Sequence, residues 1–305
     1  MTSTPPASPE REYLKVARKL IRGTDNHKYD PFTRVTYQDT LNSDRWQFPE
    51  DLISLYHHPL YNELSDAQKW QLALEEGLHF FSFNIHGEQA LVTEMEPRLY
   101  RDKRAGEDPV SSTYLQRFIH EENAHTYMLA GYCVRYGGAV KRDRNFVVQV
   151  PKLSIEAEDA LYYGRIWVLE NYLGYVNKIA FDHPDLDRTA QDIHRFHHHD
   201  EARHKAWDKA MLEENVLRIQ RAADESGQPC SELAELRRLL DAYIDYVCTA
   251  STDPGPYRTL KLENIPALRQ AVQKLPARQA QHARWIDPVR RYFDKIGLTD
   301  AAAKT

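Results

Sequence analysis

The sequence lacks the signals of several large protein classes. It contains no run of about 18 apolar residues, so no membrane-spanning helix and no membrane partner are expected. Glycine is scarce, with 12 residues among 305, and neither GxGxxG nor GxxxxGK[ST] occurs. Nothing therefore indicates a nucleotide cofactor. Flavin, haem and iron–sulfur motifs are also missing, so any redox chemistry has to draw on another group.

An excess of positive charge is missing as well. Forty Lys and Arg residues stand against 45 Asp and Glu, for a formal net charge of -5. Nucleic-acid binding usually needs a basic face, so no nucleic-acid partner is expected. The three cysteines, Cys133, Cys230 and Cys248, are widely spaced and form no metal-ligand pattern. They favour a reducing compartment, and a cytoplasmic location is expected.

The chain is predicted to hold one large domain behind a disordered lead-in. Residues 1–15 begin with a polar, proline-rich stretch that has no apolar core of the kind found in signal peptides. The single domain is expected over residues 16–305. Its metal-binding core is assigned to about 66–221, and additional helices to about 233–297.

Apolar residues recur with helical spacing through most of the chain, and strand signals are weak. Four long helices are predicted at about 66–95, 112–136, 154–181 and 186–221. Gly137-Gly138 ends the second, and Ser154 is a plausible N-cap of the third. A fifth helix is expected at about 233–249, followed by shorter helices interrupted by proline. The fold class is therefore all-α, a helical bundle with additional C-terminal helices.

Side chains suited to binding metal lie on the apolar faces of the four long helices. They are Glu88, Glu122, His125, Glu170, His197, Glu201 and His204. Residues three or four apart share one face of a helix, so each Glu-x-x-His pair can reach a common ion. The order is Glu, Glu-x-x-His, Glu, Glu-x-x-His, which is the carboxylate pattern of a di-metal bundle. It predicts two helix hairpins facing each other.

Charge balance supports this interpretation, although each residue alone is ambiguous. Four buried carboxylates repel one another, and two divalent ions carrying +4 would neutralise them. Mixed imidazole and carboxylate ligation suits iron or manganese. A single glutamate is more commonly a solvated surface residue. Glu121, four residues before His125, competes with Glu122, and the histidines at 197–199 could form a solvated patch.

At these residues the chain resembles the p-aminobenzoate (arylamine) N-oxygenase family of non-haem di-iron oxygenases. Six of the residues fall on generic di-iron positions, and His197 falls on the extra histidine that marks this family. The resemblance covers roughly residues 70 to 215. It implies a ferritin-like four-helix core that holds two iron ions, with all seven residues as protein ligands.

The resemblance also implies an activity. The expected reaction is oxidation of an amine nitrogen by O2 to hydroxylamine, with nitroso or nitro products beyond it, in natural-product biosynthesis. The substrate is a small-molecule or carrier-bound amine, and electrons come from an external donor such as a separate reductase. A homodimer is left open. The alternatives are a C–H hydroxylase or desaturase on the same site, and a ferritin-like iron store or peroxide scavenger.

Substrate contacts are not fixed by the pattern. Aromatic residues near the ligands are more typical of core packing than of a binding site. Arg165 and Arg203 are candidates for binding a substrate carboxylate, although each more commonly acts as a surface or supporting charge. Asp200 and Asp159 are candidates for orienting ligating histidines.

Overall fold

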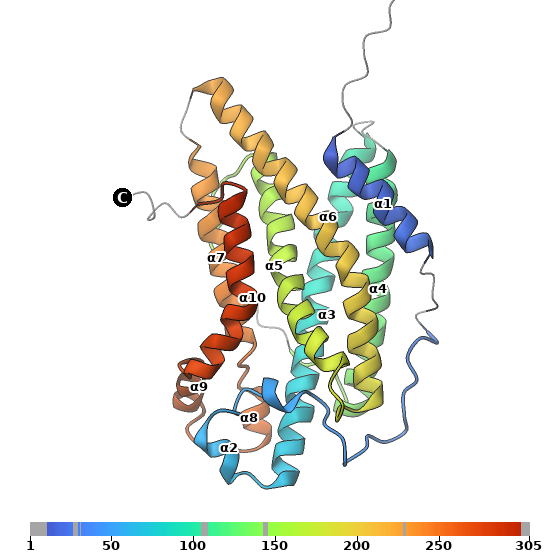
Figure 1. Cartoon of the computed structure of the whole chain (residues 1–305), viewed down its shortest axis with the longest axis vertical. Helices are drawn as coiled ribbons and strands as arrows, with labels where there is room; N and C mark the ends of the chain where they lie inside the picture. Colours follow the sequence, from blue (N-terminus) through green and yellow to red (C-terminus); the bar gives the residue numbers. More distant parts are fainter. Residues whose placement is uncertain are drawn as a thin grey trace, which may run out of the picture.

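The protein is an all-helical bundle in the computed structural model, which describes residues 11–26, 30, 32–104, 109–142, 146–227 and 230–299 (Figure 1). No strand occurs within these ranges, and the single isolated bridge joins Trp46 to Leu186. The helices are α1 (Glu12–Asn26), η1 (Glu50–Leu52), α2 (Pro59–Glu63), α3 (Asp66–Arg104), α4 (Pro109–Gly137), α5 (Ile155–Phe181), α6 (Arg188–Ser226), α7 (Ser231–Ala250), α8 (Gly255–Thr259), α9 (Ile265–Gln273) and α10 (Pro276–Lys295).

Four long helices form the core as two hairpins. Helix α3 packs on α4 and α5 packs on α6, and the hairpins face each other through contacts of α4 with α6 and of α3 with α5. Helix α1 lies across α4 and α6 (Figure 1). The predicted all-α class and the pairing of hairpins are confirmed. The face shared by the four helices is the interior into which the candidate ligands project.

Helix α5 is the central element of the molecule. It contacts α6, α3, α7 and α10, and most of its residues are buried. A helix that is apolar all round has to be covered on every side, and α7 and α10 supply the cover that the bundle alone lacks. The C-terminal helices are therefore part of the same hydrophobic core as the four-helix bundle.

Several helices begin or end where local sequence signals predict it. The Ser154 hydroxyl accepts a hydrogen bond from the amide of Ala157 and caps α5, as predicted. Helix α4 ends at Gly137, and Gly138 has a φ of 75°, a conformation that glycine adopts without strain. The segment 146–153 is an irregular connection between α4 and α5.

Other boundaries were wrong, mostly at prolines. The first long helix was expected to end near residue 95, but α3 continues through Pro97 to Arg104. Likewise α10 continues through Pro288, which was expected to interrupt it. A proline inside a helix removes one hydrogen bond and tends to kink the chain. Pro97 and Pro288 are exposed, and their neighbours Met95 and Val289 are buried in the core. Pro266 and Pro276 stand in the first turns of α9 and α10, where proline is favoured.

The expected disorder over residues 1–15 also needs correction. Residues 1–10 lie outside the described part of the chain, but α1 begins at Glu12. Three buried residues of α1, Tyr13, Ala17 and Leu20, dock it against the bundle. Their spacing of four and three residues is helical, so this amphipathic helix was readable in the sequence and was missed.

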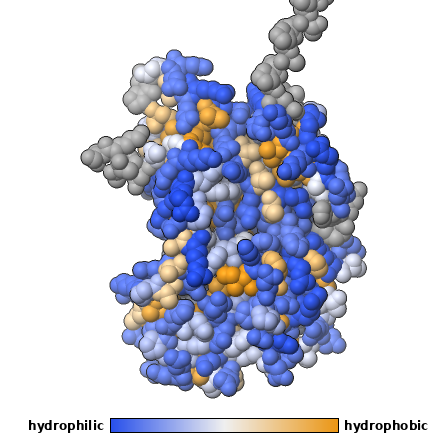
Figure 2. All heavy atoms as spheres, in the orientation of Figure 1, coloured by the Kyte–Doolittle hydropathy of each residue, from blue (hydrophilic) through white to orange (hydrophobic). Residues whose placement is uncertain are grey.

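The visible surface is largely hydrophilic, with hydrophobic residues gathered in small patches between the helices (Figure 2). Among the described helices, none combines the length and the apolar composition needed to cross a bilayer. Cys133, Cys230 and Cys248 are free thiols, and Cys133 is buried in the core.

Candidate metal centre

The four long helices bring the predicted ligands together inside the bundle. Two groups of side chains have ligand atoms within 4.8 Å of one another, and they share His125 and Glu201. The first group is Glu88, His125, His197 and Glu201; the second is Glu122, His125, Glu201 and His204. All members are at most 3% exposed. Six of the seven predicted ligands therefore converge, as two overlapping clusters.

The first cluster is centred on His197. Its Nε2 lies 2.9 Å from Glu201 Oε1 and 3.1 Å from Glu88 Oε1. Glu201 follows His197 by one helical turn of α6, and Glu88 reaches across from α3. Of the adjacent histidines at 197, 198 and 199, His197 is the one in the cluster, because one face of α6 alone points inward.

The second cluster is centred on His204. Its Nδ1 lies 2.8 Å from Glu122 Oε1 and 3.6 Å from Glu201 Oε1. His125 Nδ1 joins the two clusters, at 3.4 Å from Glu122 Oε2 and 3.5 Å from Glu201 Oε1. This is the arrangement that the two Glu-x-x-His spacings predicted.

Glu170, the seventh predicted ligand, lies at the edge of the second cluster. Its Oε1 is 3.9 Å from His204 Nδ1, and Glu170 is one of the buried residues of α5. Glu170 is not in either group of mutually close atoms. It faces Asp208 on α6 instead, a residue that the sequence interpretation did not single out.

Each candidate histidine is held through its second ring nitrogen. His125 Nε2 lies 3.3 Å from Asp200, which confirms the orienting position expected for that aspartate. His204 Nε2 lies 2.9 Å from Glu121 Oε2, and His197 Nδ1 lies 3.1 Å from the Asn177 amide. Such outer contacts fix the ring orientation and the tautomer of a metal-binding imidazole.

These contacts distinguish the positions of Glu121 and Glu122. Glu122 points into the cluster, whereas Glu121 binds the outer nitrogen of His204 and pairs with Arg203 at 2.6 Å. Arg203 also pairs with Asp200 at 2.7 Å, so it supports two of the outer carboxylates and is not placed to receive a substrate carboxylate.

Two other candidates have structural partners elsewhere. Asp159 pairs with Arg98 and Arg101 and orients none of the histidines, so that interpretation was wrong. Arg165 pairs with Glu94 on α3. Asn177 was missed altogether. It lies seven residues after Glu170, on the same face of α5, and that spacing is the signal that could have found it.

Burial of so many ionisable side chains is energetically unfavourable unless cations are bound among them. Burial raises the pKa of the Glu88 carboxyl to about 7, and it raises the pKa of Glu170 well above its ordinary value. Burial alone would lower the pKa of His204, but Glu122 and Glu201 hold it well above its ordinary value. All seven predicted ligands also keep at least one buried atom without a hydrogen bond. Two divalent cations would satisfy these atoms and neutralise four carboxylates, so the residues fit a di-metal group.

A glycine lets the two single-glutamate helices approach each other. A Cβ atom at Gly87 would come within 2.6 Å of Leu169 Cδ2. Gly87 precedes Glu88 on α3, and Leu169 precedes Glu170 on α5. The absence of a side chain at this crossing therefore sets the separation of the helices that carry these two carboxylates.

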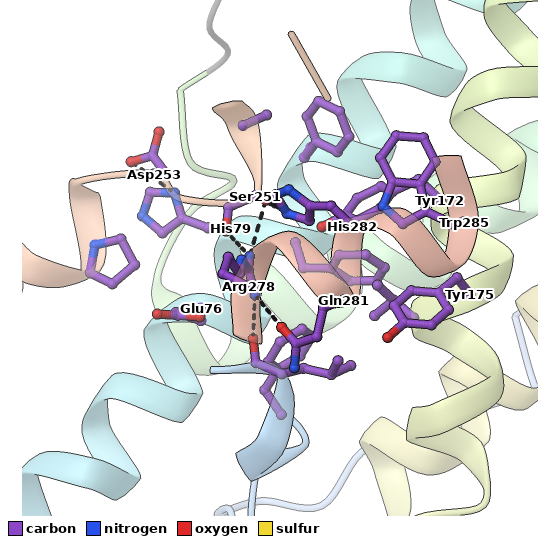
Figure 3. A pocket seen from close by; sticks show the side chains of 17 residues that line it. Glu76, His79, Tyr172, Tyr175, Ser251, Asp253, Arg278, Gln281, His282 and Trp285 are labelled. Carbon is purple, nitrogen blue, oxygen red and sulfur yellow. Dashed lines mark hydrogen bonds and ion pairs between the residues drawn. The ribbon is translucent and has the colours of Figure 1, made fainter. Parts of the chain in front are cut away.

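A small cavity of about 50 Å³, partly open to solvent, lies between α3, α5, α7 and α10 (Figure 3). Aromatic side chains line one part and polar side chains another. They include Phe80, Tyr172, Tyr175, Trp285, Glu76, His79, Arg278 and His282. The cavity does not include the cluster itself. Phe80 contacts His194, whose Nδ1 lies 2.7 Å from Asn177 Oδ1, and Asn177 in turn contacts His197.

Comparison with known proteins identifies the family. The family described as "P-aminobenzoate N-oxygenase AurF" matches residues 10–297. No curated protein sequence matches the chain significantly. Among solved structures, variants of an R2-like ligand-binding oxidase share the fold. One, with an aerobically reconstituted Mn/Fe cofactor, is 17% identical over 96% of this chain and 100% of its own, with a TM-score of 0.52. Another, with an anaerobically reconstituted Mn/Fe cofactor, is 15% identical over 95% of both chains, with the same score.

The structural likeness at this identity establishes a ferritin-like helical fold. The family match covers nearly the whole chain, including α1 and the C-terminal helices. The chain therefore belongs to the p-aminobenzoate N-oxygenase family, and it is an oxygen-dependent enzyme with a di-metal centre.

Proposed function

We propose that this protein oxidises the nitrogen of an amine with O2, and that two iron ions held by the seven predicted ligands are its resident metals. The observation that carries the proposal is the position of His197 between Glu88 and Glu201. This imidazole adds a seventh donor to the six of a generic di-metal bundle. Membership of a family named for N-oxygenation supports amine nitrogen as the atom oxidised.

The ligand set suits iron in more than one oxidation state. Four carboxylates balance two divalent ions, and the three imidazoles add neutral donors. When bound, the metal pair supplies the redox chemistry that reduces O2. Oxygen and nitrogen ligands without thiolate fit iron and manganese, and iron is the metal we propose.

The chain's own residues hold this site rigid and dry. Asp200, Glu121 and Asn177 orient the three imidazoles, and Arg203 ties Asp200 to Glu121. Phe118 stacks on the His204 ring at 3.9 Å between centroids and covers that side of the cluster. A preorganised, buried site excludes water and protects reactive oxygen species from side reactions.

The reaction needs two electrons from outside the protein. One oxygen atom of O2 enters the N–H bond of the amine, and the other leaves as water after taking up two protons and two electrons. The sequence has no flavin, haem or iron–sulfur motif to deliver those electrons. We therefore propose a separate reductase or a small reductant as the donor.

The amine substrate is proposed to occupy the cavity beside Phe80. From its inner wall, contacts between side chains run from Phe80 through His194 and Asn177 to His197. Aromatic residues on α3, α5 and α10 offer apolar contact area, and polar groups at the other end offer hydrogen bonds.

Filling this cavity tests the substrate position. Ala250, at the end of α7, lines the cavity away from the cluster. We expect Ala250→Phe to raise KM for the amine at least tenfold and to leave the metal content unchanged. Ala242→Phe, on the same helix but outside the cavity lining, is the control. Equal KM values for the two variants would place the substrate elsewhere.

The activity itself is tested with isotopic oxygen. Iron-loaded protein is incubated with a panel of aromatic and aliphatic amines, a chemical reductant and 18O2, and products are analysed by mass spectrometry. We expect a hydroxylamine or a more oxidised nitrogen product that carries 18O. Glu201→Ala, which removes a carboxylate shared by both clusters, should give none. Oxygen inserted into carbon alone would instead identify a C–H hydroxylase.

A further inference from the structure

A fourth side chain extends the row of ligands along α6. His197, Glu201, His204 and Asp208 are separated by four, three and four residues, so they lie on one face of the helix. Asp208 is 0% exposed, and neither of its carboxylate oxygens has a hydrogen-bond partner within the described part of the chain. The row of inward polar groups therefore continues one turn beyond the Glu-x-x-His motif.

Asp208 meets Glu170 across the interface of α5 and α6. The two carboxyl groups face each other at hydrogen-bonding range, but both Glu170 oxygens also lack a donor. Trp207 packs on Tyr114, and the Trp207 Nε1 and Tyr114 hydroxyl groups are buried without partners too. Two ionised carboxylates in contact are strongly unfavourable when buried, so this pair has to take up either a proton or a metal cation. A cation would also satisfy the oxygens that have no partner.

We propose that Asp208 is an additional carboxylate ligand for the metal ion held by Glu122, Glu170 and His204. The assignment rests on the proposed di-metal centre and extends its ligand set from seven residues to eight. Glu170 links Asp208 to the second cluster, because its Oε1 lies 3.9 Å from His204 Nδ1. Oxygen-rich ligation of this kind favours a hard cation such as iron or manganese.

The two metal positions then differ in charge. With Asp208 as a ligand, the ion beside His204 gains an anionic carboxylate, whereas the ion beside His197 has the extra neutral imidazole. An additional carboxylate strengthens the electrostatic attraction for a cation. The two ions are therefore expected to load with different affinities, and loss of Asp208 weakens one of them selectively.

Metal titration of apo-protein tests this assignment. Mn(II) is added without reductant, and free Mn(II) is counted by electron paramagnetic resonance. Wild type is expected to bind two ions, and Asp208→Asn is expected to bind one of them about 10- to 100-fold more weakly, with the other unchanged. Asp208→Glu keeps the carboxylate and should recover part of that affinity. Asp192→Asn, on the same helix but outside the cluster, is the matched control and should behave as wild type.

Thermal unfolding of the apo-protein separates ligation from a purely structural role. Because Asp208 is buried without a donor, apo Asp208→Asn should melt no lower than apo wild type, while its stabilisation by Mn(II) should be smaller. Asp208→Asn that binds both ions with wild-type affinity would overturn the assignment alone. Wild type that fails to bind two ions would overturn the di-metal centre, and the assignment of Asp208 with it.

Discussion

At the scale of single residues, the site depends on side chains that do not face the metal positions. Each of the three candidate histidines has one nitrogen in the cluster and the other against an outer partner. Asn177 has a double role, because its amide contacts both His197 and His194. One amide can accept from one imidazole and donate to the other, which fixes both ring orientations.

Replacing Asn177 with leucine should therefore weaken metal binding without unfolding the protein. We expect a 10- to 100-fold loss of affinity for one ion, because the His197 ring loses its orienting contact. Asn171→Ala is the control, since that amide bonds the carbonyl of Trp167 in its own helix. Metal titration monitored by calorimetry is the measurement. Equal affinities in the two variants would show that Asn177 does not position the ligand.

Glu76 in the cavity wall gives a pH dependence away from the metal ligands. Burial raises its pKa from 4.5 to about 7, although both the amide and the hydroxyl of Ser54 donate to it. A carboxyl whose pKa is raised on folding stabilises the folded state below its unfolded pKa, and this stability is lost as pH rises through the folded pKa. The wild type should thus lose stability between about pH 4.5 and 7.

The Glu76→Gln variant isolates that effect. Relative to this variant, the wild type should lose at most roughly 3 kcal/mol of unfolding free energy across the interval. Urea unfolding at several pH values measures the difference. Parallel stability curves for the two proteins would mean that Glu76 is not desolvated in the folded state.

At the scale of helices, close approach is achieved where side chains are missing. Helix α7 packs on α5 beside Gly164, where a Cβ atom would lie 2.8 Å from Leu240 Cδ2. Leu240 is fully buried, so it has little room to move aside. This close crossing keeps α7, one of the C-terminal helices, packed against α5.

A methyl group at this crossing should separate α7 from α5. We expect Gly164→Ala to destabilise the protein by about 1–3 kcal/mol through overpacking. In the double variant Gly164→Ala/Leu240→Ala, the truncated leucine leaves space for the new methyl group. The penalty for the glycine change should therefore shrink in that background, as measured by denaturant unfolding. Strict additivity of the two changes would argue against direct contact.

The sequence predicts the long helices better than it predicts their ends. Amphipathic periodicity and caps such as Ser154 are local, so they could be found without a structure. The passage of α3 through Pro97 and of α10 through Pro288 depends on packing from distant segments, which local patterns do not report. The short α8 has the same limitation, since its five residues dock on α3.

At the site, too, local sequence patterns predict some residues, whereas contacts between distant helices determine others. Glu-x-x-His spacing on two helices was enough to predict that Glu122, His125, Glu201 and His204 converge, because i and i+3 positions share a face. The outer partners Glu121 and Asn177 form contacts between different helices, and their roles required the packing of those helices. Asp208 carried a readable signal, its spacing of four from His204, but a single aspartate has little weight without knowledge of its burial.

At the scale of the whole molecule, the fold concentrates charge in its interior. Two hairpins and the covering helices bury four glutamates, three histidines and Asp208 inside the bundle. Such an interior is costly unless cations enter it, so metal binding and stability are linked. The cavity lies between the bundle and the C-terminal helices α7 and α10, so these helices contribute to the proposed substrate site.

The most direct test of this account is a crystal structure of the iron-loaded protein with anomalous diffraction recorded on both sides of the iron absorption edge. We expect two iron peaks inside the bundle, one bounded by Glu88, His197 and Glu201 and the other by Glu122, Glu170 and His204. A single peak, peaks on the surface, or no iron at these carboxylates after loading would contradict the di-iron centre.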